Sequence, residues 1–264
     1  MKLINFNICI KIDNSYKVGE FIKSKNPDIV TFQEVTRHLD ESVLNMYKSQ
    51  KIIDDILKND LPYSFFGPLF KADKFTKNGQ ISRNINGFIE QGNEIKSKFP
   101  IITAKNEFYY RQYELSIDRT NFELEDHPRA IQIVEINVNN NKLHIINVHG
   151  TYTKNKKDTE RTLIQTQYII SVAKKIDAPL IIVGDFNLSP ETKSIKLLTK
   201  EFRNLIDEYN INSTRPEFDD GLYKDNVVVD YIFVNDKIKI NNFEVCNTQI
   251  SDHLPLILDF DIIN

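Results

Sequence analysis

The chain has 264 residues, of which 41% are hydrophobic and 27% charged, with a net charge of -3 and an isoelectric point near 6.0. This composition excludes a disordered chain, and two cysteines are too few for a disulfide framework. The slightly acidic balance gives no global basic field for nucleic acid, and no apolar run approaches the ~20 residues of a membrane span. We expect one cytoplasmic domain over residues 1–264, and we take it to be a monomer.

The N-terminal part alternates between strand and helix patterns. Apolar runs predict strands over 2–9 and 28–33, whereas apolar spacings of three and four predict helices over 14–25 and 39–58. A strand, a helix and a strand in this order are typical of a βαβ unit with two parallel strands. The chain therefore opens as an α/β protein.

The region 62–150 changes to short apolar runs separated by Gly, Pro and Asn, which predicts a mostly antiparallel sheet with a hairpin turn in NVNNNK. The second half then resembles the first, with helices over 157–176 and 190–206 flanking a strand at 179–186, and with three more strands at the end. Runs such as LIIV are apolar at consecutive positions, which indicates sheets covered on both faces. We therefore predict a four-layer α/β sandwich, in which two packed mixed sheets are flanked by helices.

Polar side chains suited to catalysis stand directly beside the apolar strand runs. They are Glu34, His149, Asp185, Asn187, Asp252 and His253. Strand ends in such sheets converge on one rim, where a rigid scaffold positions the loops. A single site is therefore the simplest interpretation.

Asp230 differs from these residues because it lies inside the apolar run VVVDYIFV. An ionised carboxylate there is strongly disfavoured unless it is paired. A hydrogen bond to an imidazole would provide the partner and fix the tautomer of the ring, so His253 or His149 is the expected recipient. The alternative is a structural acid that accepts hydrogen bonds from backbone or hydroxyl groups.

Each candidate also has an ordinary structural explanation when it is considered alone. GDFN at 184–187 is typical of a tight turn, Glu34 of an acid at a helix N-terminus, His149 of a surface loop and Asp252 of a helix cap. Their joint occurrence favours chemistry, because acids and an amide suit a hard cation and imidazoles suit phosphate oxygens. No Walker-type phosphate loop and no GxSxG motif is present in the sequence.

The ordered series NFNI, FQEV, GNEIKSKFPI, NVHG, GDFN, VVVDYIFV and SDHLPL resembles the endonuclease/exonuclease/phosphatase superfamily over positions 4 to 256. The resemblance implies a four-layer sandwich and metal-dependent hydrolysis of a phosphate ester, with Mg²⁺ as the cofactor and Mn²⁺ as a substitute. It implies a metal site formed by Glu34 together with Asn7 and Asp252. It also implies that Asn93, in GNEI, faces the substrate.

The same resemblance implies roles for the residues around the phosphoryl group. Asp185 would orient or deprotonate the attacking water, and Asn187 would contact the phosphate. His253 would contact or protonate the phosphate with Asp230 as its hydrogen-bond partner, and His149 would bind the phosphate oxygens. These side chains would stabilise the charge that grows in the transition state.

The substrate is open at this level. NVHG stands where AP endonucleases carry YxPN, so the chain resembles the branch with phosphatases, lipid phosphodiesterases, deadenylases and tyrosyl-DNA phosphodiesterases. Nucleic acid is the first choice, because basic and aromatic residues gather in three segments that could bind phosphates and stack on bases. The segments contain Lys71, Lys74, Lys77 and Arg83; Lys154, Lys156, Lys157 and Arg161; and Tyr109, Tyr110, Arg111 and Tyr113. The alternatives are a phospholipid or inositol-phosphate esterase and a catalytically silent binding module.

Overall fold

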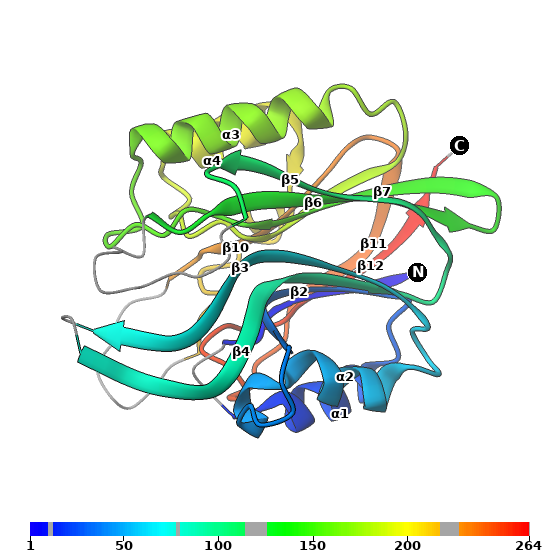
Figure 1. Ribbon diagram of the computed structural model, residues 1–264. Helices are drawn as coiled ribbons and strands as arrows, with labels where there is room; N and C mark the ends of the chain where they lie inside the picture. The colour runs from blue at the N-terminus through cyan, green and yellow to red at the C-terminus, as the bar shows by residue number, and fades with distance from the viewer. Residues whose placement is uncertain (10–12, 78–79, 114–125, 217–226, 264) are drawn as a thin grey trace.

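The computed structural model describes residues 1–9, 13–77, 80–113, 126–216 and 227–263. Within this part of the chain, two six-stranded sheets pack face to face, and helices cover their outer faces (Figure 1). The helices α1 and α2 lie against one sheet, and α3 and α4 lie against the other. The predicted four-layer sandwich of two mixed sheets is therefore confirmed.

The first sheet has the strand order β11-β12-β1-β2-β4-β3. Its strands are β1 (Lys2–Asn7), β2 (Ile29–His38), β3 (Tyr63–Lys77), β4 (Gln80–Ser97), β11 (Ile238–Val245) and β12 (Leu256–Ile262). The strands β1 and β2 are parallel, and α1 (Ser15–Lys25) connects them, as the opening βαβ pattern predicts. The second covering helix is α2 (Ser49–Leu57).

The second sheet has the order β5-β6-β7-β8-β10-β9. Its strands are β5 (Ile101–Tyr110), β6 (Arg129–Val138), β7 (Asn141–His149), β8 (Leu180–Asp185), β9 (Arg203–Asn204) and β10 (Asp230–Val234). Here β7 and β8 form the parallel pair, which α3 (Glu160–Ala173) connects. A second helix, α4 (Lys193–Glu201), completes the outer layer.

Two predicted helices are shorter than the sequence pattern suggests. In the region 39–58 a 3-10 turn, η1 (Asn45–Tyr47), precedes α2. In the region 190–206 the helix α4 ends because Phe202 adopts extended dihedral angles (φ -137°, ψ 150°), after which Arg203 pairs with Val234 of β10. The short helix α5 (Leu205–Glu208) follows. Sheet pairing thus outweighs helix propensity at the end of α4.

The interior between the sheets is mainly apolar, with Ile, Leu, Val and Phe side chains from both inner faces packed into one cluster. A line of buried amides interrupts it. Gln33 of β2 donates to Asn5 at 2.8 Å and, across the sandwich, to Asn147 of β7 at 2.7 Å. Asn147 in turn donates to Gln132 at 2.8 Å. This amide network joins the two sheets by directional bonds and fixes their relative register.

Along the described chain, no helix combines the length and the apolar character needed to cross a membrane.

Candidate active site

Strand register brings three of the predicted residues side by side at one rim of the second sheet. His149, the last residue of β7, pairs with Asp185, the last residue of β8, and Asp185 pairs with Asp230 of β10. Asp230 is the first residue of β10, whereas the sequence predicted a position in the middle of the strand. From the first sheet, Asn7 at the end of β1 reaches the same rim, where its amide donates to Asp185 at 3.1 Å.

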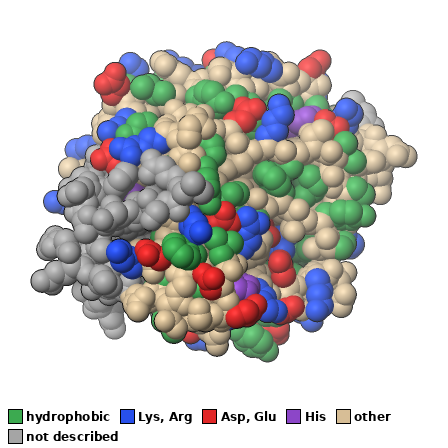
Figure 2. Space-filling model, viewed as in Figure 1, with side chains coloured by type: hydrophobic (Ala, Val, Ile, Leu, Met, Phe, Trp, Pro, Cys, Tyr) green, Lys and Arg blue, Asp and Glu red, His purple; other side chains and the backbone are tan. Residues whose placement is uncertain are grey.

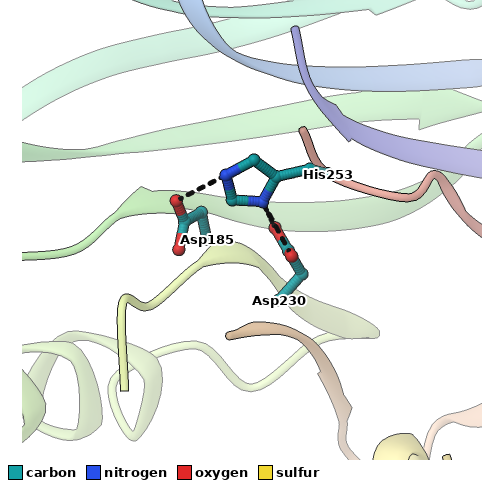
Figure 3. Close-up of side chains that lie close together, drawn as sticks. All are labelled: Asp185, Asp230 and His253. Atoms are coloured by element: carbon teal, nitrogen blue, oxygen red, sulfur yellow. Dashed lines mark hydrogen bonds and ion pairs between the residues drawn. The ribbon is translucent and has the colours of Figure 1, made fainter. Parts of the chain in front are cut away.

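His253 lies between two buried carboxylates (Figure 3). Its Nδ1 is 2.9 and 3.0 Å from the two oxygens of Asp230, and its Nε2 is 3.6 Å from Oδ2 of Asp185. All three side chains are buried. Asp230 thus has the imidazole partner that its apolar surroundings require, and its backbone N–H donates to Thr214 Oγ1 at 3.2 Å.

The charges of these groups depend on one another. Burial would raise the pKa of Asp185, but the nearby His253, His149 and Lys156 hold that pKa below its usual range. Burial raises the pKa of Asp230 although His253 opposes the shift. Burial and Arg215 would lower the pKa of His253, but Asp230 and Asp185 together raise it. The arrangement therefore favours an ionised Asp185 opposite a positively charged His253.

Asp185 also accepts hydrogen bonds from the backbone and the side chain of Asn187. Its Oδ1 accepts the backbone N–H of Asn187 at 2.8 Å, and its Oδ2 accepts the side-chain amide of Asn187 at 3.3 Å. Asn187 adopts a left-handed conformation (φ 57°), which folds the GDFN segment back on itself. The GDFN segment is therefore a tight turn, as expected, and the same turn holds Asn187 against Asp185.

Lys156 points into this region, where its ammonium donates to Oδ1 of Asn187 at 2.7 Å and lies 4.3 Å from the ring centroid of Tyr152. Burial lowers the pKa of Lys156, and Asp185 opposes the shift. The sequence suggested this lysine as one of several basic residues that could bind the phosphates of nucleic acid. Its side chain instead orients the amide of Asn187.

Glu34 stands on a β-bulge in β2. The pairing of β2 with β4 shifts between Phe32 and Val35, so Gln33 and Glu34 together face Asn93. Glu34 adopts φ 61°, a left-handed value that is unusual for a residue with a Cβ. Bulges of this kind redirect one side chain and are common beside active sites. Burial lowers the pKa of Arg129, and Tyr109, Asp185 and the half-buried Glu34 oppose the shift, which places Glu34 and Asp185 around the same guanidinium.

Asp252 is bound by Arg215, which donates from Nη1 to its carboxylate at 2.7 Å and to its carbonyl at 2.6 Å. Burial would raise the pKa of Asp252, but His253 and Arg215 hold it at about 2. The neighbouring Ser251 donates to the carbonyl of Asn7 at 2.8 Å. The segment SDH is thereby attached to the end of β1, which brings Asp252 beside Asn7.

His149 lies on the other side of Asp185, with Nε2 3.8 Å from Oδ2. Burial and the adjacent Arg129 lower the pKa of His149 to about 3, so the ring is neutral at neutral pH. Arg129 is itself buried at the first position of β6, and its Nη1 is 3.5 Å from the carbonyl of His149. A buried guanidinium next to acids and a histidine is suited to binding an anion.

Asn93 is fully buried on the inner face of β4, and neither atom of its side-chain amide has a hydrogen-bond partner among the described residues. An unpaired amide opposite the Glu34 bulge is a site where a ligand or a hydrated ion would supply the missing partner. The acids around it suit a hard divalent cation. Asp185, Asp230 and His253 also offer ligand atoms within 4.8 Å of one another. The donor set therefore fits a divalent metal ion.

Arg129 and Arg215 were not predicted from the sequence, and Lys156 was predicted only as one of several basic residues that could bind nucleic acid. Arg129 directly precedes an apolar strand run, so the rule that found Glu34 and His149 could have found it as well. Arg215 lies in a polar loop without any recognisable pattern, and the sequence grouped Lys156 with its basic neighbours rather than with Asn187. Long-range contacts alone bring these two cations to the site.

The aromatic and basic residues expected to bind nucleic acid are mostly engaged within the protein. The hydroxyl groups of Tyr109, Tyr110 and Tyr113 donate to Gln165, Asp126 and Glu90. The guanidinium of Arg161 lies 4.6 Å from the ring centroid of Tyr110, that of Arg111 lies 5.8 Å from the same centroid, and Lys71 lies 4.1 Å from that of Phe88. Lys154 and Lys157 are exposed and Lys74 is partly exposed. The side chains of Lys77 and Arg83 are outside the described residues.

Comparison with known proteins decides the family. The sequence profile of the endonuclease/exonuclease/phosphatase family matches residues 5–253, nearly the whole chain. The chain belongs to this family. The resemblance of its motifs to endonuclease/exonuclease/phosphatase proteins is thereby confirmed, and hydrolysis of phosphate esters is the activity of the family. No curated protein sequence matches the chain at a significant level.

Solved structures of endonuclease/exonuclease/phosphatase proteins share the fold. One from Beutenbergia cavernae aligns with a TM-score of 0.76 at 13% identity, over 100% of this chain and 72% of that one. The mannosyl-6-phosphatase of Bacteroides thetaiotaomicron aligns at 0.66 and 13% identity, over 99% and 100%. The catalytic domain of human Nocturnin, with a bound sulfate, aligns at 0.65 and 16% identity, over 99% and 93%.

Proposed function

We propose that this chain hydrolyses a phosphate ester by metal-assisted, in-line attack of water. The observation that carries the proposal is the buried series Asp230, His253 and Asp185, in which an imidazole is held by one carboxylate and faces a second one. Buried acids and a histidine of this kind are costly to keep in a protein that only binds. That cost argues against a catalytically silent module.

The residues proposed to hold the metal are Asn7, Glu34 and Asp252. Carboxylate and amide oxygens suit Mg²⁺, and Mn²⁺ accepts the same ligands. When bound, the ion would polarise a phosphoryl oxygen and neutralise negative charge. In the protein, the carboxylate of Asp252 accepts a hydrogen bond from Arg215 at Oδ2, a weak contact of 3.5 Å from Ser251 at Oδ1, and a further hydrogen bond from Cys9. These donors fix the orientation of the carboxylate that would bind the ion.

Asp185 is proposed to take the proton of the attacking water. Its carboxylate is buried and ionised, and Asn7 and Asn187 fix its orientation. A fixed acceptor within hydrogen-bond reach is the geometric requirement for a general base. His253 is proposed to donate from Nε2 to the phosphoryl group, and Asp230 holds the ring in that orientation through Nδ1. Neutral His149 and the amide of Asn187 would bind the remaining oxygens.

Within this function, a phosphodiester of nucleic acid is the first substrate that the sequence suggests. The described surface gives this choice little support, because the three tyrosines and Arg161 already have partners in the protein. Figure 2 shows Lys and Arg side chains interspersed with Asp and Glu over the visible face, without a continuous basic tract. Strong binding of a nucleic-acid backbone relies on such a tract.

A small phosphate ester is the second candidate, and phospholipid head groups and inositol phosphates belong to this class. The protein needs no basic tract for such a substrate, because the cations Arg129, Lys156 and Arg215 all stand close to Asp185, the residue proposed to activate the water. The similarity to a mannosyl-6-phosphatase and to a sulfate-bound domain shows that the fold accommodates a small ester and a tetrahedral anion in other proteins.

The test is a substrate panel with Mg²⁺, Mn²⁺ and EDTA. The panel contains single- and double-stranded nucleic acids, abasic DNA, 5′-tyrosyl DNA, inositol phosphates, sphingomyelin and p-nitrophenyl phosphate. We expect hydrolysis that requires the metal and that falls by several orders of magnitude in Asp185→Ala and His253→Ala. Normal turnover by either variant, or no turnover of any ester by the folded wild-type protein, would contradict the proposal.

A further inference from the structure

A groove of about 820 Å³ lies beside the proposed phosphoryl site. One wall is the segment that follows α5, from Tyr209 to Pro216, and the other is the end of β11 with the loop that leads to β12. The groove thus runs between the edges of the two sheets. None of the residues considered for the reaction lines it except Arg215.

Arg215 connects the groove to the site. It lines the groove, and its guanidinium donates to the carboxylate of Asp252 at 2.7 Å. On the opposite wall, Leu254 follows His253 directly and donates its backbone N–H to the carbonyl of Thr214 at 2.8 Å. The walls are therefore tied together at the end of the groove that adjoins the site.

The chemistry of the lining is that of neutral hydrogen bonding. Four side-chain amides, Asn210, Asn212, Asn247 and Gln249, line the groove, and all four side chains are exposed to solvent. Each amide both donates and accepts, which matches hydroxyl groups that do the same. Among the described lining residues the charged groups are Glu244 and Arg215, and Arg215 already binds Asp252. A polyanion would find little electrostatic attraction in this groove.

An aromatic surface completes the lining. Tyr209 is 39% exposed, and its ring meets that of the buried Phe243 edge to face, with centroids 5.4 Å apart. The contact fixes a partly exposed phenol at the wall of the groove. A ring with an apolar face and a hydroxyl tip, surrounded by amides, suits a ligand whose C–H groups and hydroxyl groups alternate.

We propose that this groove binds the alcohol part of the substrate, and that the alcohol is a neutral sugar, so the substrate is a sugar phosphate. The inference rests on the proposed phosphoesterase function and adds the substrate class. A phospholipid would require a broad apolar wall, and a nucleic acid would require cations along the groove. The amide lining offers neither.

The test compares glucose 6-phosphate and mannose 6-phosphate with glycerol 3-phosphate, a dinucleotide and p-nitrophenyl phosphate. We expect the highest kcat/KM for a hexose phosphate. Asn212→Ala and Gln249→Ala should each lower the ratio of kcat/KM for that hexose phosphate to kcat/KM for p-nitrophenyl phosphate by about 3- to 10-fold, the effect of one lost hydrogen bond. Asn242→Ala changes an exposed amide of the same β11 strand outside the groove and should leave this ratio unchanged.

The outcomes separate the two proposals. Hydrolysis of p-nitrophenyl phosphate combined with a preference for the dinucleotide or for glycerol 3-phosphate overturns the groove assignment alone, as does a ratio that the groove variants do not change. If no ester is hydrolysed, the phosphoesterase proposal fails. Calorimetric titration with glucose 6-phosphate then still decides about the groove, because binding must weaken in the Asn212→Ala/Gln249→Ala double variant and not in Asn242→Ala.

Discussion

Nδ1 of His253 lies within 3.0 Å of both carboxylate oxygens of Asp230, whereas its Nε2 is directed toward Asp185. The contact leaves one ring nitrogen available for a substrate. Asp230→Asn keeps the volume but removes the charge that holds the ring, so we expect kcat to fall by about 10- to 100-fold with a smaller change in KM. The control is Asp236→Asn, an exposed acid just after β10. Equal kinetics in the two variants would exclude a positioning role for Asp230.

Glu34 is proposed as a ligand of the metal, and its removal should weaken metal binding. We expect Glu34→Gln to raise the Mg²⁺ concentration for half-maximal activity by about tenfold or more, and to lower Mg²⁺ affinity by a similar factor in calorimetry. Glu191→Gln, an exposed acid in the loop after GDFN, serves as the control. An unchanged titration in Glu34→Gln would refute the ligand role.

Lys156 orients Asn187 through a hydrogen bond of 2.7 Å. A hydrogen bond to a charged group contributes about 1.5–3 kcal/mol, so Lys156→Met should lower kcat/KM by roughly 10- to 100-fold on any phosphate ester. Lys157→Met removes an exposed neighbour and should have little effect on a small ester. If Lys157→Met lowers activity on nucleic acid in a salt-dependent manner, the substrate is a polyanion after all.

Glu94 forms a buried ion-pair cluster on the outer face of the first sheet, beneath α2. Its carboxylate is 3.3 Å from the ammonium of Lys96 and accepts a hydrogen bond from Gln50 at 3.2 Å, and Lys96 also contacts Asp54. Burial raises the pKa of Glu94 to about 7, although Lys96 opposes the shift. The folded protein therefore binds this proton more tightly than the unfolded chain, in which a glutamate titrates near about 4.3.

The consequence for stability has a definite sign. The stabilisation that comes from protonated Glu94 is present below about pH 4.3 and is lost as the pH rises through about 7. We expect the free energy of unfolding of the wild-type protein, relative to that of Glu94→Gln, to fall by on the order of 1–3 kcal/mol between pH 5 and pH 8. Urea unfolding at both pH values measures it, with the exposed Glu20→Gln as the control. A constant difference would contradict the raised pKa.

Gln33 and Asn147 connect the two sheets, so breaking the amide network should lower the free energy of unfolding. Gln33→Leu would leave the buried acceptors of Asn5 and Asn147 without this donor, and we expect a loss on the order of 3 kcal/mol in the free energy of unfolding. Gln167→Leu, at an exposed position of α3, should change stability by less than about 0.5 kcal/mol. A loss in Gln33→Leu no larger than in this control would show that the network contributes little.

Sequence reasoning predicted the layers because local patterns determine them. The strands of the parallel pairs β1/β2 and β7/β8 have continuous apolar runs, which predict buried strands. The hairpin turn at Asn139 and Asn140 has the expected positive φ values of 50° and 71°. The strand in 28–33 was predicted too short, because β2 continues to His38 through pairing with Ile89, and such distant pairing leaves no local signal.

The site, too, contains residues that local patterns could predict and residues that only distant contacts bring together. Strand-end residues such as Asp185 and His149 could be predicted because register alone places them together. Arg215 reaches Asp252 across 37 positions of sequence, and the amide of Gln33 reaches Asn147 across 114. Contacts of this kind depend on how the sheets stack, which periodicity does not encode. The roles of the site residues stay predictions until the variants are measured.

The bulge in β2 has a consequence for how this strand tolerates length changes. Phe32 and Val35 both pack on the helix-covered side of the sheet although an odd number of steps separates them, and the additional residue makes this possible. Deleting Gln33 or Glu34 would restore strict alternation with Phe32 and Val35 still on that side, but only one residue would then stand opposite Asn93. Either the amide that joins the two sheets or the acid proposed to bind the metal would be lost, so the extra residue lets one short stretch of strand carry both.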